Sequence, residues 1–175
     1  MTGLPPLALS VRQPWAWAII NGGKVIENRS MGSIRAGRMG PGHICIHAAS
    51  GMSEAEYRYG QWRLARHGVR CPRPDELVRG GLIGTVQVTD IVTESDSEWF
   101  GGDAGLLLAD PRAITPIPAS GALGYFEWQP ATGFAPDKPW MRRFDRAQGD
   151  MRTLDMFPDD APSSRSPPAK PWMKD

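Results

Sequence analysis

The stretch from Leu7 to Arg29, LALSVRQPWAWAIINGGKVIENR, constrains the fold more than any other part of this sequence. Its first residues alternate between apolar and small or polar side chains, a period of two that is typical of a half-buried strand. Pro14 follows at a position that suits the first turn of a helix, and two glycines end the short apolar run behind it. We therefore predict a strand over 7–11, a helix over 15–21 and a strand over 25–29.

Three charged side chains follow the glycine turn: Lys24, Glu27 and Arg29. In a strand, Glu27 and Arg29 share one face, about 6.6 Å apart, and Lys24 lies beside them at the turn. One interpretation is a surface ion pair that contributes little to stability. The other is a binding site, in which the cations hold phosphate groups and Trp15 of the preceding helix stacks on a base, as in the recognition of single-stranded RNA.

The residues GGKVIENR, from Gly22 to Arg29, match the G-x-K-x-x-E-x-R signature of the ASCH domain. Residues 9–16, LSVRQPWA, also resemble the strand and helix that open this family, and the resemblance covers about residues 7–128. It implies an α+β fold, namely a PUA-like mixed β-barrel flanked by two or three short helices. PUA domains are small barrels that bind RNA, so the resemblance also implies RNA or a modified nucleobase as the ligand.

The resemblance leaves more than one activity open. Some bacterial ASCH proteins are amidohydrolases that act on N4-acetylcytidine, and others are ribonucleases, which makes Lys24 and Glu27 candidate catalytic residues. Glu27 stands where the amidohydrolases have a threonine, so a carboxylate replaces a hydroxyl and is suited to act as a general base. Binding of RNA or a nucleobase is the first hypothesis, a hydrolase acting on RNA or a nucleoside is the second, and a protein-interaction module is the third. No cofactor is implied.

Further candidates for ligand binding lie around the same cleft. We expect residues 30–42, which are rich in glycine, to form a loop with two arginines, which is either a mobile basic flap near the site or a solvated connector. His47 belongs to a segment that resembles the family's "IHA" strand. Its distance from His43, about 13 Å along a strand, is too great for both to bind one metal ion, and no metal site is predicted. The predicted ligand-binding residues are Arg12, Gln13, Trp15, Lys24, Glu27, Arg29, Arg35, Arg38, His47 and Trp99.

Other patterns predict the remaining elements. Ser53 and Glu56 have capping-box spacing, which predicts a helix that ends near His67. We consider Ile114–Pro118 too rich in proline for a central strand. Further strands of the same barrel are predicted over 43–47, 82–92 and 121–128, with a short buried strand over 106–109.

The chain has 175 residues, 41% of them hydrophobic, and a formal net charge of +1. This charge excludes a uniformly basic nucleic-acid binder but leaves room for a local basic patch. Two cysteines do not make a disulfide framework. No apolar run approaches the ~20 residues that span a bilayer, so we expect a cytoplasmic protein without membrane contact.

We expect one ASCH domain over residues 5–129 and a proline-rich tail over 130–175. The tail has few large aliphatic residues, which predicts a flexible segment. The sequence KPWM occurs twice in it, at 138–141 and at 170–173. The repeat is either a coincidence or a ligand for a groove on this molecule or on a partner, and the oligomeric state is open.

Overall fold

The computed structural model describes residues 3–145. Six strands form one curled sheet in the order β2-β5-β4-β3-β1-β6, and four short helices accompany it. The strands are β1 (Leu7–Val11), β2 (Ile26–Arg29), β3 (Gly42–Ala48), β4 (Gly81–Val92), β5 (Ala104–Pro118) and β6 (Tyr125–Glu127). The helices are α1 (Trp15–Asn21), α2 (Met31–Ala36), α3 (Glu54–Arg66) and α4 (Pro139–Arg142), with a 3-10 turn η1 (Pro74–Glu76). The fold is of the predicted α+β class, with the sheet curled into a half-barrel and with four helices where two or three were expected.

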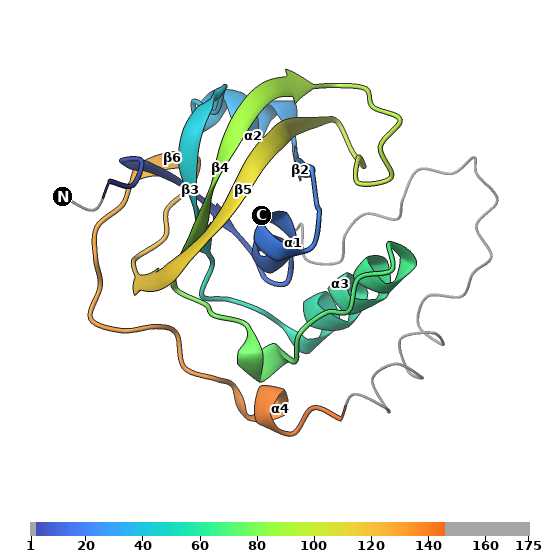
Figure 1. Cartoon of the computed structure of the whole chain (residues 1–175), viewed down its shortest axis with the longest axis vertical. Helices are drawn as coiled ribbons and strands as arrows, with labels where there is room; N and C mark the ends of the chain where they lie inside the picture. The colour runs from blue at the N-terminus through green and yellow to red at the C-terminus, as the bar shows by residue number, and fades with distance from the viewer. Residues whose placement is uncertain (1–2, 146–175) are drawn as a thin grey trace.

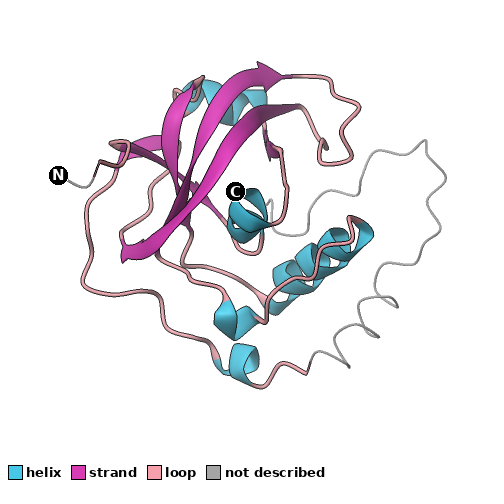
Figure 2. Cartoon of the chain, viewed as in Figure 1, coloured by secondary structure: helices cyan, strands magenta, loops and turns pink. Residues whose placement is uncertain are grey.

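The arrangement separates a sheet from a helical end (Figure 1). Strands β4 and β5 cross the molecule as one long antiparallel pair, whereas β1 and β3 run parallel. Helix α1 packs against β3, β4 and β5, so it lies on one face of the curled sheet. Helices α3 and α4 lie beyond it with η1, away from the strands (Figure 2). The strands predicted over 25–29, 43–47, 82–92 and 121–128 belong to one sheet, as expected.

The described residues contain three clusters of buried apolar side chains, and the two larger ones follow from this arrangement. The first lies between α1 and the sheet and includes Leu9, Ile19 and Ile44, which are almost completely buried. The second joins α1 to the helical end through residues such as Tyr57 of α3. The capping box predicted at the start of α3 is present: Ser53 accepts a hydrogen bond from the Glu56 amide, and the Glu56 carboxylate accepts one from the Ser53 amide.

The predicted loop over residues 30–42 was wrong in part, because it contains helix α2. The Ser30 hydroxyl accepts a hydrogen bond from the Ser33 amide and so caps the helix. Ile34 is only 3% exposed and anchors the helix to the core. The glycines of this segment suggested a loop, yet the serine cap and one buried side chain are enough to form a short helix against the sheet.

The proline-rich segment before Pro118 is part of β5 and lies at an edge of the sheet, so the prediction that it is not a central strand is confirmed. β5 is longer than the strand predicted over 106–109, and it continues past a bulge at Asp110, whose φ is +51°. β2 pairs only with residues 104–107, so the second half of β5 pairs with β4 alone. Because that half is an edge, prolines lacking an N–H are tolerated there.

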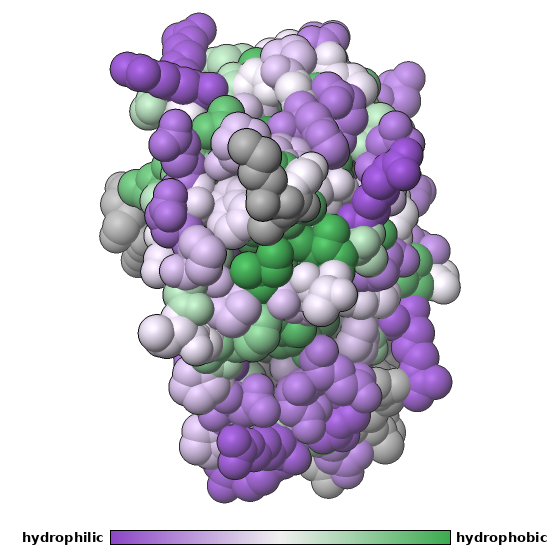
Figure 3. All heavy atoms as spheres, turned by 60° about the vertical axis from the view of Figure 1, so that its left-hand side comes forward, coloured by the Kyte–Doolittle hydropathy of each residue, from purple (hydrophilic) through white to green (hydrophobic). Residues whose placement is uncertain are grey.

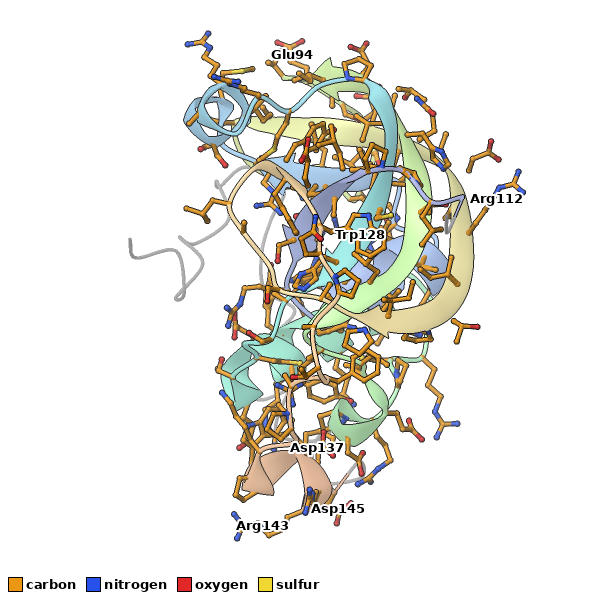
Figure 4. The ribbon with its side chains drawn as sticks, turned by 90° about the vertical axis from the view of Figure 1, so that its left-hand side faces the viewer. Glu94, Arg112, Trp128, Asp137, Arg143 and Asp145 are labelled. Atoms are coloured by element: carbon orange, nitrogen blue, oxygen red, sulfur yellow. The ribbon has the colours of Figure 1, made fainter. Side chains whose placement is uncertain are left out.

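The segment after the last strand returns to the helical end and closes it. Met141 of α4 is fully buried, and the ring of Phe144 lies 4.9 Å from that of Tyr57. The Arg79 side chain, which is 2% exposed, donates hydrogen bonds to the carbonyls of Ser50 and Pro136. Figure 4 shows the labelled residues of this segment, Asp137, Arg143 and Asp145, at the end opposite Glu94. The first KPWM sequence is thus packed, while the second lies outside the described residues.

A close contact between glycines joins α2 to the loop before β6. The Tyr125 amide donates a hydrogen bond to the Gly37 carbonyl at 3.0 Å. Gly124 has a φ of +68°, and a Cβ at this position would lie 2.4 Å from the Cα of Gly37. The two backbones therefore touch at positions where neither can carry a side chain.

Within residues 3–145, no helix is both long enough and apolar enough to cross a bilayer.

Candidate functional site

A cavity of about 1090 Å³ lies beside the parallel strands β1 and β3. The loop 119–124 and the segment 131–135 form another side of it, so residues from distant parts of the chain meet there. Its polar lining includes Ser10, Arg12, Arg29, Ser33 and His47.

Hydrophobic side chains also border this cavity. Leu123 is 98% exposed and Phe134 is 43% exposed. Of the three large hydrophobic residues that are exposed in the described part of the chain, these are the two that line the cavity. Figure 3 shows a face on which hydrophobic residues gather across the middle, between hydrophilic surfaces at either end. An open cavity with both arginines and an exposed ring suits a ligand that has both charge and a flat apolar face.

Arg29 enters the cavity at the end of β2 and is held on two sides. Its Nη2 donates a hydrogen bond to the Ser10 carbonyl at 2.8 Å, and its Nε lies 3.3 Å from Oε1 of Glu27. The other carboxylate oxygen of Glu27 accepts a hydrogen bond from Lys24 Nζ at 2.7 Å. The predicted trio therefore does converge, as a chain of charges from the interior to the cavity.

The trio is graded in exposure, which bears on the role of each member. The Lys24 side chain is 5% exposed, that of Glu27 is 11% exposed and that of Arg29 is 24% exposed. Lys24 also donates to the Ile26 carbonyl. Only Arg29 of the three lines the cavity. Direct contact of Lys24 with a ligand, and general-base action by Glu27, stay predictions.

Arg12 reaches the same cavity from the residue after β1. Its guanidinium makes two hydrogen bonds to the carboxylate of Glu56 in α3, the one from Nη2 at 2.7 Å. Burial alone would raise the pKa of Glu56, but the hydrogen bonds from Arg12 and from the Ser53 amide outweigh it and lower that pKa below its usual value. Arg12 is thus anchored by a carboxylate that also caps a helix.

His47 lies at the base of the cavity and is 1% exposed. Its Nδ1 is 2.9 Å from the Ser10 hydroxyl, and its Nε2 is 2.9 Å from the Ala119 carbonyl. Burial lowers the pKa of His47, although the hydrogen bond with Ala119 acts in the opposite direction. The imidazole is therefore neutral at neutral pH. Among residues 3–145, no group of three or more metal-binding side chains could hold an ion.

The other predicted binding residues lie outside the cavity lining. Gln13 is buried, where it accepts a hydrogen bond from the Trp17 amide and donates one to the Val78 carbonyl, so it joins α1 to the η1 region. Trp15 packs edge-on against Tyr59, with Lys24 Nζ 6.0 Å from its ring centroid.

Trp99 is 9% exposed and stacks on His67 with the ring centroids 3.6 Å apart, away from the cavity lining. Arg35 and Arg38 are exposed on and after α2. A ligand role for each of these three residues remains a prediction that the cavity itself does not support.

Sequence reasoning missed several residues that line the cavity, notably Ser10, Gly121 and Phe134. Ser10 lay inside the resembling segment, but its importance depends on the register between β1 and β3. Phe134 lay beyond the expected domain boundary, and the one available signal was an isolated aromatic residue in a proline-rich segment.

The curled sheet with β1 and β3 parallel and short helices at its ends defines a PUA-like fold of the α+β class. The model of the ASCH domain family matches residues 9–132, and the chain belongs to this family. Among solved structures, a serine-to-alanine mutant of ZmASCH from Zymomonas mobilis matches with 17% identity and a TM-score of 0.35, over 78% of this chain and 91% of that chain. No curated protein matches.

Proposed function

We propose that this ASCH domain binds single-stranded RNA, or a nucleotide with a modified base, in the cavity beside β1 and β3. The observation that carries the proposal is the presence of cationic and aromatic groups in one cavity: Arg29, Arg12 and Phe134. A cation can neutralise phosphate, and an exposed ring can stack on a base, which contributes about 1–3 kcal/mol per base.

Arg29 is the main phosphate contact in this proposal. Lys24 and Glu27 act behind it, because Glu27 fixes the direction of the Arg29 guanidinium and Lys24 holds Glu27. The trio has one more positive than negative charge, so Arg29 keeps attraction for an anion even while paired. Arg12 and Glu56 together have no net charge, so Arg12 attracts an anion less strongly than Arg29 does. The neutral His47 and Ser10 then contact the sugar or the base edge.

The test is the affinity of the full chain for a fluorescently labelled single-stranded RNA, measured by anisotropy over a series of salt concentrations. Arg29→Gln should weaken binding about tenfold, on any sequence, and reduce the slope of log affinity against log salt by about 0.7, the value expected for one phosphate contact. Gln retains a donor for the Ser10 carbonyl, so the fold should survive.

Arg112→Gln is the matched control. Arg112 is an exposed arginine of β5, outside the cavity lining (Figure 4), and its loss should change affinity less than twofold beyond the general effect of charge. Equal losses for the two variants, or no RNA binding by the unmodified chain, would contradict the proposal.

A further inference from the structure

Ser10 and His47 are brought together by the pairing of two strands. They are opposite each other in the parallel register of β1 and β3, so their side chains project from the same face of the sheet. The Ser10 Oγ lies 2.9 Å from His47 Nδ1, and both residues line the cavity. A hydroxyl and an imidazole at hydrogen-bond distance are the first requirement of an activated nucleophile.

The Ala119 carbonyl determines how the imidazole is protonated. It lies 2.9 Å from His47 Nε2 and can only accept a hydrogen bond, so Nε2 carries the proton. The neutral ring then presents a lone pair at Nδ1, and the Ser10 hydroxyl donates to it. The base is thus oriented by a third group, as in the serine–histidine arrangements of hydrolases, with a carbonyl in place of the usual carboxylate.

Gly121 lies directly against this pair, in which Ser10 is partly exposed and His47 is buried. A Cβ at Gly121 would lie 2.7 Å from Cε1 of His47 and 3.0 Å from Oγ of Ser10, so a side chain here would cover both groups. Arg29 supplies the remaining component, since its guanidinium is bonded to the Ser10 carbonyl and lines the same cavity. A fixed positive charge beside the nucleophile stabilises an oxyanion that forms there.

We propose that Ser10 is a nucleophile activated by His47, and that the pair hydrolyses carboxylic esters held in this cavity. Esters fit better than amides, because the imidazolium formed on attack is stabilised here by a carbonyl dipole and not by a full negative charge. His47 is therefore a weaker base than in a triad with a carboxylate, and it suits the alcohol of an ester, which is a better leaving group than the amine of an amide. The proposal does not depend on RNA being the ligand.

The chemistry balances with water as the second reactant. Ser10 Oγ forms a bond to the ester carbonyl carbon as its proton moves to His47 Nδ1. The bond from that carbon to the alcohol oxygen then breaks, and the alcohol leaves with the proton from Nδ1. Water attacks the acyl-serine, again giving a proton to Nδ1, and the carboxylic acid departs as Ser10 regains its proton.

The test uses two probes on the full chain. A fluorophosphonate should attach to Ser10 with loss of fluoride, seen as one adduct by intact mass and located by peptide mapping. p-Nitrophenyl acetate should be hydrolysed with release of p-nitrophenol. His47→Gln should slow both reactions by about 100-fold or more, while Ser10→Ala should abolish the adduct. The rate of labelling should rise with pH through a step below pH 6.5, since burial lowers the pKa of His47.

Ser95→Ala is the control, because Ser95 is an exposed serine outside the cavity lining and its loss should leave the labelling normal. The unmodified chain gives the decisive result even if a variant folds poorly. An adduct at Ser10 supports the proposal. No adduct, or an adduct at another residue, overturns it and makes the Ser10–His47 hydrogen bond a structural link between β1 and β3. RNA affinity, measured separately, would be unaffected by that outcome.

Discussion

Arg29 and Arg12 reach the cavity from different regions, and each is held by a largely buried glutamate. Arg29 pairs with Glu27, two residues before it in β2, whereas Arg12 pairs with Glu56 from helix α3, 44 residues away. Glu27 is shared with the buried Lys24, while Glu56 is shared with the Ser53 amide. The first cluster therefore has a net positive charge and the second is neutral.

This difference in net charge indicates that the two ion pairs have different roles. The Glu27 cluster lies in one short segment and places the positive charge of Arg29 at the cavity. The Glu56 cluster joins the sheet to the helical end, and the Arg12 side chain is 47% exposed, against 24% for Arg29. Loss of the carboxylate should thus leave a buried cation unpaired in the first cluster, but a cation that water can reach in the second.

The largest effect should come from Glu27→Gln. Removing one member of a buried ion pair costs about 3 kcal/mol or more, because the Lys24 ammonium stays buried without its counter-charge. The free energy of unfolding, measured by urea denaturation, should fall by about that amount. Lys24→Met combined with Glu27→Gln should recover part of the loss. If the free energy of unfolding of the single variant falls by less than about 1 kcal/mol, the buried Lys24 does not need Glu27 as its counter-charge.

Glu56→Gln should have a smaller effect, about 1–2 kcal/mol, on the same measurement. The variant weakens the charge-assisted bonds from Arg12 and the Ser53 amide, but water can solvate the half-exposed guanidinium. The expected difference between the two glutamates would be contradicted if Glu56→Gln lowered the free energy of unfolding as much as Glu27→Gln does. Glu94→Gln serves as the control, since Glu94 is an exposed carboxylate that belongs to neither cluster.

The smallest effect should appear in the pH dependence of stability. Because the folded pKa of Glu56 is lowered, the unfolded chain binds more protons just below the ordinary value of 4.5. The stabilisation from Glu56 is therefore complete above that pH and is lost as the pH falls through the folded pKa. Unfolding measured over a pH series should show the difference between the natural chain and Glu56→Gln narrowing on acidification. A constant difference would contradict the lowered pKa.

The parts of the site that could be predicted from sequence are those made by near neighbours. Lys24, Glu27 and Arg29 follow one another in a turn and a strand, so their convergence depends on local geometry alone. The bond from Arg12 to Glu56 depends on how α3 docks, and the Ser10–His47 pair depends on strand register. The burial of Lys24 is likewise a tertiary property. More of the fold than of the site could be predicted from the sequence, because hydrophobic periodicity and helix caps act locally. The exceptions were α2 and the edge half of β5, which depend on the elements that pack against them.

The contact between Gly37 and Gly124 has a practical consequence for anyone modifying this protein. Both residues belong to surface connections, which usually accept substitutions and inserted tags. Here even one methyl group would push the backbone of α2 away from the loop 119–124, which forms a side of the cavity. A reporter group inserted at this turn would thus alter the cavity directly, while one placed on the connection around Glu94, outside the cavity lining, would leave it intact.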